Sequence, residues 1–262
     1  MNKQQNNKDT SWNKVASWYD QLLKNDDSYQ AKVIVPNLLR ILDLKKDEKV
    51  YDLACGQGYF ANIFAKMGAC VVASDLSKKL IETAKENSKL IRNDGGKISF
   101  YISPAHRAQF LKNNEIDTIV VVLAIQNIEN ISEVLAECHR VLKNNGRMIL
   151  VLNHPAFRVP QASDWYFTDG VQSRIVSKYL SESKISIDMT PGEKNPKKKI
   201  KTISFHRSLQ YYVKLFSKNG FAITRLEEWI SHKQSENGPR QLAEDKARKE
   251  IPLFMCIEVK KL

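Results

Sequence analysis

One stretch decides the fold: Val50-Tyr51-Asp52-Leu53-Ala54-Cys55-Gly56-Gln57-Gly58-Tyr59-Phe60. The apolar run from Val50 to Ala54 predicts a strand, and Phe60 opens an apolar pattern with helical spacing. Glycines between a strand and a helix let a ligand approach the backbone and face the helix N-terminus. The stretch therefore predicts a ligand-binding loop.

The same loop allows two kinds of ligand. Gly56, Gly58 and Ala61 satisfy the GxGxxA spacing of dinucleotide-binding proteins. Against that interpretation, Asp52 points a carboxylate at the place where a pyrophosphate would lie, and bulky Tyr59 and Phe60 crowd the helix start. A carboxylate at this position suits a ligand with a cationic part, such as an amino-acid ammonium or a sulfonium.

Beyond this loop, short apolar runs alternate with helical patterns, which is typical of a parallel sheet wrapped by helices. Five strands are predicted in the first part of the chain: 50–54, 69–74, 98–102, 118–124 and 147–152. Two more, 221–229 and 253–259, lie near its end. The β-branched run of 118–124 indicates a central strand buried on both faces. Ser77 and Ser208 are predicted helix caps.

The rhythm breaks after Pro160. Residues 161–178 are expected to be irregular or weakly helical, while 179–189 alternates like a strand and is expected to form a hairpin with 203–206. The fold class is thus α/β, a Rossmann-like, seven-stranded, mostly parallel sheet with helices on both faces and a lid insertion after strand five.

Asp75 ends the second strand. An acid at this position can accept hydrogen bonds from both hydroxyls of a ribose, and the alternative is a helix cap or a surface acid.

Together these residues resemble the class I S-adenosylmethionine-dependent methyltransferases, in particular their small-molecule, type 11-like branch. Asp52 to Gly58 looks like the glycine-rich first motif of that family, and Asp75 looks like its ribose-binding acid. The segments 205–209 and 251–254 are similar to the C-terminal half of small-molecule methyltransferases.

The resemblance implies S-adenosyl-L-methionine as the cofactor and a set of contacts with it. The implied cofactor-binding residues are Tyr19, Asp52, Ala54, Gly56, Gly58, Asp75, Leu76, Pro104, Ala105, Ile125 and Gln126. Ser103-Pro104 stands where the family usually has an acid, so the Ser103 hydroxyl or a backbone carbonyl is expected to replace that acid near the adenine. Tyr19 shares a helical face with Trp12, Val15 and Ala16, which either covers the cofactor or packs on the sheet edge.

The resemblance also implies four regions. These are an N-terminal helical cap (1–45), a cofactor-binding core (46–160), a lid or substrate insertion (161–207) and a C-terminal completion of the sheet (208–262).

Two histidines are candidates for the reacting end. His154 follows strand five, and His206 leads from the hairpin into a helix. Each can act as a base on the acceptor or form a structural hydrogen bond. Methyl transfer needs a base only when the acceptor is protonated, so neither is required. Trp165, Tyr166, Phe167 and Tyr179 can line the acceptor pocket or pack within the insertion.

Composition narrows the function classes. The 262 residues carry a net charge of +12 and are 42% hydrophobic, which is ordinary for a globular protein. No apolar run reaches the roughly 20 residues of a membrane helix, and a polar N-terminus indicates a cytoplasmic protein. Four scattered cysteines predict neither a zinc site nor a disulfide framework.

The leading hypothesis is a methyltransferase for a small organic acceptor. A methyltransferase acting on RNA or protein is the alternative, with the lysines at 194, 197, 198, 199 and 201 contacting phosphates. Nucleic acid is the less favoured partner because aromatic residues do not interleave this lysine cluster. The alternative interpretation of the cluster is a solvated hairpin tip. A non-catalytic, cofactor-binding regulator and a nicotinamide-dependent oxidoreductase are the options from other classes.

Overall fold

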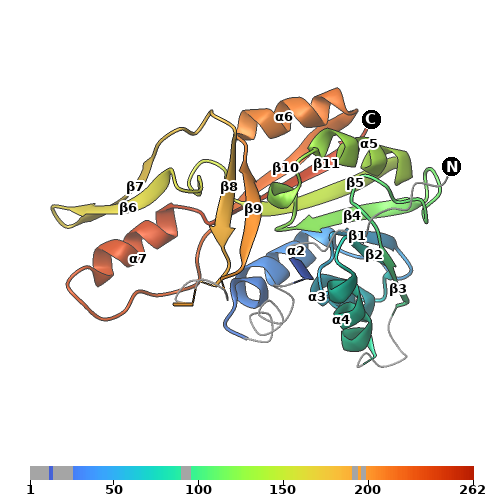
Figure 1. Ribbon diagram of the computed structural model, residues 1–262, viewed down its shortest axis with the longest axis horizontal. Coiled ribbons are helices and arrows are strands. Elements are labelled where there is room, and N and C mark those ends of the chain that lie inside the picture. Colours follow the sequence, from blue (N-terminus) through green and yellow to red (C-terminus); the bar gives the residue numbers. More distant parts are fainter. Residues whose placement is uncertain (1–11, 14–25, 90–95, 191–193, 196–198) are drawn as a thin grey trace.

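The computed structural model describes residues 12–13, 26–89, 96–190, 194–195 and 199–262. A seven-stranded sheet runs through it in the order β10-β11-β5-β4-β1-β2-β3 (Figure 1). Its strands are β1 (Lys49–Leu53), β2 (Cys70–Asp75), β3 (Ile98–Ile102), β4 (Ile116–Val122), β5 (Leu142–Asn153), β10 (Phe221–Trp229) and β11 (Phe254–Lys261). Strands β3, β2, β1, β4 and β5 are parallel, and β11 is antiparallel to both of its neighbours. The predicted α/β, mostly parallel sheet is confirmed.

Helices cover both faces of the sheet (Figure 1). The helical elements of the core are η1 (Gln30–Ile34), α2 (Val35–Leu42), α3 (Tyr59–Lys66), α4 (Lys78–Ser88), η2 (Ile125–Asn127), α5 (Ile131–Val141) and α6 (Leu209–Lys218). Met148, Leu150 and Leu152 of β5 join one buried cluster with α5 and α6, whereas Ile149 and Val151 join another with α2 and α3. This alternation shows that the central strands are buried on both sides, as predicted for the strand now labelled β4.

Both predicted helix caps are present. The Ser77 hydroxyl accepts a hydrogen bond from the Leu80 amide at 3.1 Å, and the Ser208 hydroxyl accepts one from the Tyr211 amide at 3.4 Å. Each cap satisfies a backbone donor in the first helical turn. Of the helices in the described part of the chain, none is long and apolar enough to cross a membrane.

The insertion after β5 consists of two hairpins. The second pairs β8 (Ser183–Asp188) with β9 (Lys201–His206) in antiparallel register, which confirms the predicted hairpin. Lys197 and Lys198 of the predicted basic cluster lie outside the described residues.

The first hairpin corrects the expectation of an irregular or weakly helical segment. β6 (Ser163–Thr168) pairs with β7 (Val171–Val176) through the two-residue turn Asp169-Gly170, whose φ angles are 49° and 76°. Asp-Gly favours two positive φ angles and is a strong local hairpin signal. The dipeptide was therefore a signal present in the sequence that the apolar pattern alone did not reveal.

The aromatic residues of this hairpin pack against arginines of the same region. Arg174 lies over the Trp165 ring at 5.1 Å, and Arg240 lies over the Phe167 ring at 4.7 Å. Arg240 immediately precedes α7 (Gln241–Glu250), which lies beside the hairpin (Figure 1). The Trp165 contact lies within the insertion, whereas Phe167 packs against the segment that precedes α7, and neither ring is among the residues that line the cavity described below.

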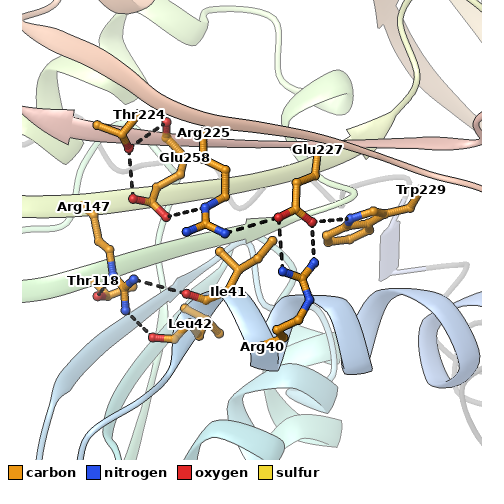
Figure 2. A network of polar contacts seen from close by, with 10 residues as sticks. All are labelled: Arg40, Ile41, Leu42, Thr118, Arg147, Thr224, Arg225, Glu227, Trp229 and Glu258. Carbon is orange, nitrogen blue, oxygen red and sulfur yellow. Dashed lines mark hydrogen bonds and ion pairs between the residues drawn. The ribbon is translucent and has the colours of Figure 1, made fainter.

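A polar network ties α2 to the strands at the sheet edge (Figure 2). Arg40 of α2 donates two hydrogen bonds to the Glu227 carboxylate, and the Trp229 indole donates a third at 3.2 Å. Nearby, Arg147 of β5 donates to the carbonyl oxygens of Ile41 and Leu42 at the end of the same helix. These contacts fix the helix that covers one face of the core.

The charge of Glu227 contributes to stability in a pH-dependent way. The Arg40 guanidinium lowers the pKa of Glu227 from 4.5 to about 2. Because the folded-state pKa is depressed, the stabilisation is present above about pH 4.5 and is lost as the pH falls toward 2. Glu227→Gln is expected to lower the free energy of unfolding by about 1–2 kcal/mol at pH 7, after allowance for partial solvent screening, and by much less at pH 3.

Urea denaturation at both pH values measures this effect. The matched control is Glu86→Gln, which removes the exposed Lys89–Glu86 pair and is expected to cost less than about 0.5 kcal/mol. Equal losses for the two variants at pH 7 would contradict the assignment.

Candidate functional site

A cavity of about 310 Å³ opens at the carboxyl ends of β1, β2, β3 and β4. It lies where the strand order reverses, between β1 and β4, which is where open α/β sheets bind ligands. Its lining consists of Trp12, Asp52, Ala54, Cys55, Gly56, Tyr59, Phe60, Asp75, Leu76, Leu80, Ser103, Pro104, Ala105, His106, Val122, Leu123, Ala124, Asn127, Ile128 and Glu129.

The glycine loop forms one wall of this cavity. Ala54, Gly56 and Gly58 have φ angles of 58°, 57° and 76°, so the backbone turns sharply between β1 and α3. A Cβ atom on Gly58 would lie 3.1 Å from both the Ala84 Cβ and the Phe100 ring, so a side chain there would crowd α4 and β3. Gly58 therefore acts through the loop geometry, and it is not among the lining residues.

Asp52 lies at the floor of the cavity and is 2% exposed. Its Oδ2 atom has no hydrogen-bond partner among the described residues. Burial raises the pKa of Asp52 to about 7, the Ala61 backbone N–H opposes that rise, and the neighbouring charge of Asp75 adds to it. An orphaned buried carboxylate oxygen in a ligand cavity favours a ligand that donates hydrogen bonds or carries positive charge.

Asp75 stands at the end of β2, within hydrogen-bond distance of the glycine loop. Its two carboxylate oxygens accept hydrogen bonds from the Gly56 amide at 3.0 Å and the Ser77 amide at 2.8 Å. Burial raises its pKa, and these backbone donors oppose the rise. A carboxylate has about four acceptor positions, so each oxygen retains one for a ligand hydroxyl.

The charge of the lining matches S-adenosylmethionine better than a dinucleotide. Asp52, Asp75 and Glu129 line the cavity, whereas none of its described lining residues is a lysine or arginine. The cofactor implied by the sequence carries a sulfonium and an ammonium, which the acids of the lining attract. A pyrophosphate would meet two carboxylates without a cationic side chain.

The residues after β4 that line the cavity differ from those that the sequence predicted. Leu123 and Ala124 line the cavity, and Leu123 has a φ angle of 53°, an unusual value for a bulky residue. Ile125, a predicted contact, is fully buried in the apolar core. The side-chain amide of Gln126, also a predicted contact, donates to the Leu123 carbonyl at 2.9 Å. Neither Ile125 nor Gln126 is among the lining residues.

Some of the remaining predicted contacts line the cavity, and others lie outside the described residues. Leu76, Pro104 and Ala105 line the cavity, as does Ser103, whose hydroxyl donates to the Arg107 carbonyl at 2.5 Å. Tyr19, Val15 and Ala16 lie outside the described residues, but Trp12 of the same predicted face lines the cavity.

Sequence reasoning also missed several lining residues. The polar ones are His106 and the pair Asn127 and Glu129. His106 follows Ala105 directly, so its position after β3 was a usable signal, whereas Asn127 and Glu129 have no pattern that separates them from a surface loop.

His154 is held by local hydrogen bonds. Its Nε2 lies 2.6 Å from Glu228 Oε1, and its Nδ1 accepts from the amides of Ala156 and Phe157 at 3.2 and 3.4 Å. Burial lowers its pKa, and Glu228 opposes that change. Both ring nitrogens are engaged and the residue is not among the cavity lining, so the structure supports the local structural role over the role of a base.

His206 is likewise engaged away from the cavity. It is 4% exposed, and its Nε2 lies 2.8 Å from the Tyr179 carbonyl oxygen, to which it donates. The Tyr179 hydroxyl in turn accepts from the Leu209 amide at 3.0 Å. This chain of contacts joins the insertion to the start of α6, and it too supports a structural role.

Known proteins resemble this chain in sequence and in fold. Residues 51–150 match the family model of a methyltransferase domain. An S-adenosylmethionine-dependent methyltransferase from Mesorhizobium loti superposes with a TM-score of 0.66 over 90% of this chain and 99% of that chain, at 20% sequence identity. This likeness shows the fold.

Two curated relatives match part of the chain. An uncharacterized protein of Haemophilus influenzae is 30% identical over 138 residues, which are 52% of this chain and 54% of that protein. A demethylmenaquinone methyltransferase of Streptomyces avermitilis is 26% identical over 163 residues, covering 60% of this chain and 65% of that enzyme. The chain thus spans between about half and two thirds of the length of these relatives.

The sheet order, the glycine loop and the two acids define the class I S-adenosylmethionine-dependent methyltransferase fold. Residues 51–150 match a methyltransferase domain, and the chain as a whole has the fold of the S-adenosylmethionine-dependent methyltransferases with which it superposes.

Proposed function

We propose that the protein transfers a methyl group from S-adenosylmethionine to a small organic acceptor by in-line displacement. The observation that carries this proposal is the pair of acids, the buried Asp52 and the partly buried Asp75, that line one cavity together with the glycine loop. Bound there, the cofactor supplies a methyl group on a positively charged sulfur.

The chain's own residues then bind, orient and exclude water. Asp75 accepts hydrogen bonds from the ribose hydroxyls, and Asp52 attracts the ammonium end. Leu123, Ala124 and Ile128 form an apolar wall beside the reacting centre. Alignment of donor and acceptor in a dry cavity supplies the main acceleration, so the proposed reaction requires no base from His154 or His206.

A small acceptor is supported by two features. The non-ionic lining of the cavity is mostly apolar, and the curated relatives that match include several demethylmenaquinone methyltransferases, whose name gives demethylmenaquinone as the acceptor. The insertion of residues 161–207 is proposed as a lid, because Arg207, directly after β9, donates to the Ile128 and Glu129 carbonyls and Lys184 of β8 pairs with the Glu129 carboxylate.

Calorimetric titration tests the cofactor assignment. We expect micromolar affinity, about 8 kcal/mol, for S-adenosylmethionine and S-adenosylhomocysteine and no binding of NADH. NADH serves as the control because it contains the same adenosine. Binding of NADH alone would overturn the proposed function.

A further inference from the structure

Arg207 is a buried cation in a place where no chemistry has been assigned. It directly follows β9 and is only 4% exposed. Among the described residues no carboxylate forms an ion pair with it. A buried charge without a counter-ion is costly, so its retention calls for a specific role.

The guanidinium is held by backbone carbonyls and aromatic rings. Its Nη2 donates to the carbonyl oxygens of Ile128 at 3.0 Å and Glu129 at 2.6 Å. The rings of Phe205 and Tyr211 lie 5.0 and 5.5 Å from its Cζ, so they stabilise the cation in place of an anion. The side chain is therefore rigid and directed at one short loop.

That loop is the wall of the cavity that follows β4. Asn127, Ile128 and Glu129 all line the cavity, whereas Arg207 itself does not. The insertion reaches this loop at two further points: β9 packs against η2, and Lys184 of β8 pairs with the Glu129 carboxylate at 2.9 Å, although both of these side chains are largely exposed. Exposed pairs contribute little, so the buried guanidinium is the stronger of the two polar links between the insertion and the residues 128–129.

We propose that Arg207 is a positioning residue that fixes the wall 127–129 against the bound ligands through the two backbone carbonyls. The inference rests on the proposed function, because that wall lies beside the proposed methyl-transfer centre. It does not require that Arg207 contact the cofactor or the acceptor, and it assigns the β8–β9 hairpin a mechanical connection to the cavity.

Arg207→Lys tests the proposal, since lysine keeps the charge but loses the planar group that binds two carbonyls and stacks between two rings. We expect amide hydrogen exchange in a peptide covering 123–130 to become about 10-fold faster, with unchanged exchange in β1 and β5. We also expect the dissociation constant for S-adenosylhomocysteine to rise by about 10-fold. Tyr211→Leu, which keeps Arg207 but removes one of its rings, is expected to give a smaller change in the same direction.

Two comparisons separate the possible outcomes. Lys184→Met removes the exposed pair with Glu129 and is expected to leave both readouts within about twofold of wild type. Uniformly faster exchange in Arg207→Lys, or faster exchange confined to β9 and α6, would overturn the proposal and leave a purely structural arginine. If the wild-type protein did not bind S-adenosylhomocysteine, the proposed function would fail, whereas the exchange of 123–130 would still test the link itself.

Discussion

Asp75→Ala is expected to weaken the binding of S-adenosylmethionine by on the order of 100-fold. The substitution removes two charge-assisted hydrogen bonds to the ribose, each contributing roughly 1.5 kcal/mol or more in a partly desolvated site. It also frees the Gly56 amide, which donates to Asp75 at 3.0 Å, so the glycine loop loses an anchor. Calorimetric titration at pH 7.5 measures the change.

Asp75→Asn separates these two contributions. The asparagine oxygen still accepts a hydrogen bond but carries no charge, so an intermediate loss of about 10-fold is expected. Asp43→Ala, at an exposed acid whose ion pair among the described residues is with Lys45, is the matched control and should leave binding unchanged. If Asp75→Ala bound the cofactor as well as wild type, the acid would be a loop anchor and helix-cap residue rather than a ribose ligand.

The glycine loop and its two neighbouring acids could be predicted because their determinants are local. Asp52, Gly56, Gly58 and Asp75 lie within two consecutive strand–loop units, and each strand end is marked by an apolar run. The carboxyl ends of neighbouring parallel strands meet at one sheet edge, so sequence order alone brings these residues together.

The wall after β4 could not be placed in the same way. The predicted contacts Ile125 and Gln126 lie two residues beyond Leu123 and Ala124, which line the cavity. The difference arises at Leu123, whose φ of 53° ends the strand and redirects the chain. A leucine carries no signal for positive φ, since tertiary contacts and not local preference impose it.

Arg207 shows a further limit of sequence reasoning. Arginine is usually exposed, and nothing in its neighbours indicates burial. Its environment is created by β9, α6 and the loop after β4, which are far apart in the chain and meet only in the folded protein. By contrast, the Asp169-Gly170 hairpin was predictable from its turn chemistry.

The second large effect concerns pH. Burial raises the pKa of Asp52 to about 7, so at pH 6 most of the free protein carries this carboxyl protonated. A cationic ligand binds the ionised form and therefore displaces the proton. The affinity for S-adenosylmethionine is expected to be nearly constant above pH 7 and to fall by about 10-fold for each unit of pH below it.

Titrations between pH 5 and pH 7.5 measure this profile, and Asp52→Asn provides the test of its origin. The neutral isostere should bind more weakly at pH 7.5, by about 30-fold, and should lose most of the pH dependence, because no proton is displaced at position 52. The pKa of Asp75 is raised as well, so any slope that remains is assigned to that acid and should disappear in the variant carrying both Asp52→Asn and Asp75→Asn. An unchanged slope in Asp52→Asn would show that another group titrates, and the orphaned Oδ2 of Asp52 would then face the cavity without holding the cationic end of the ligand.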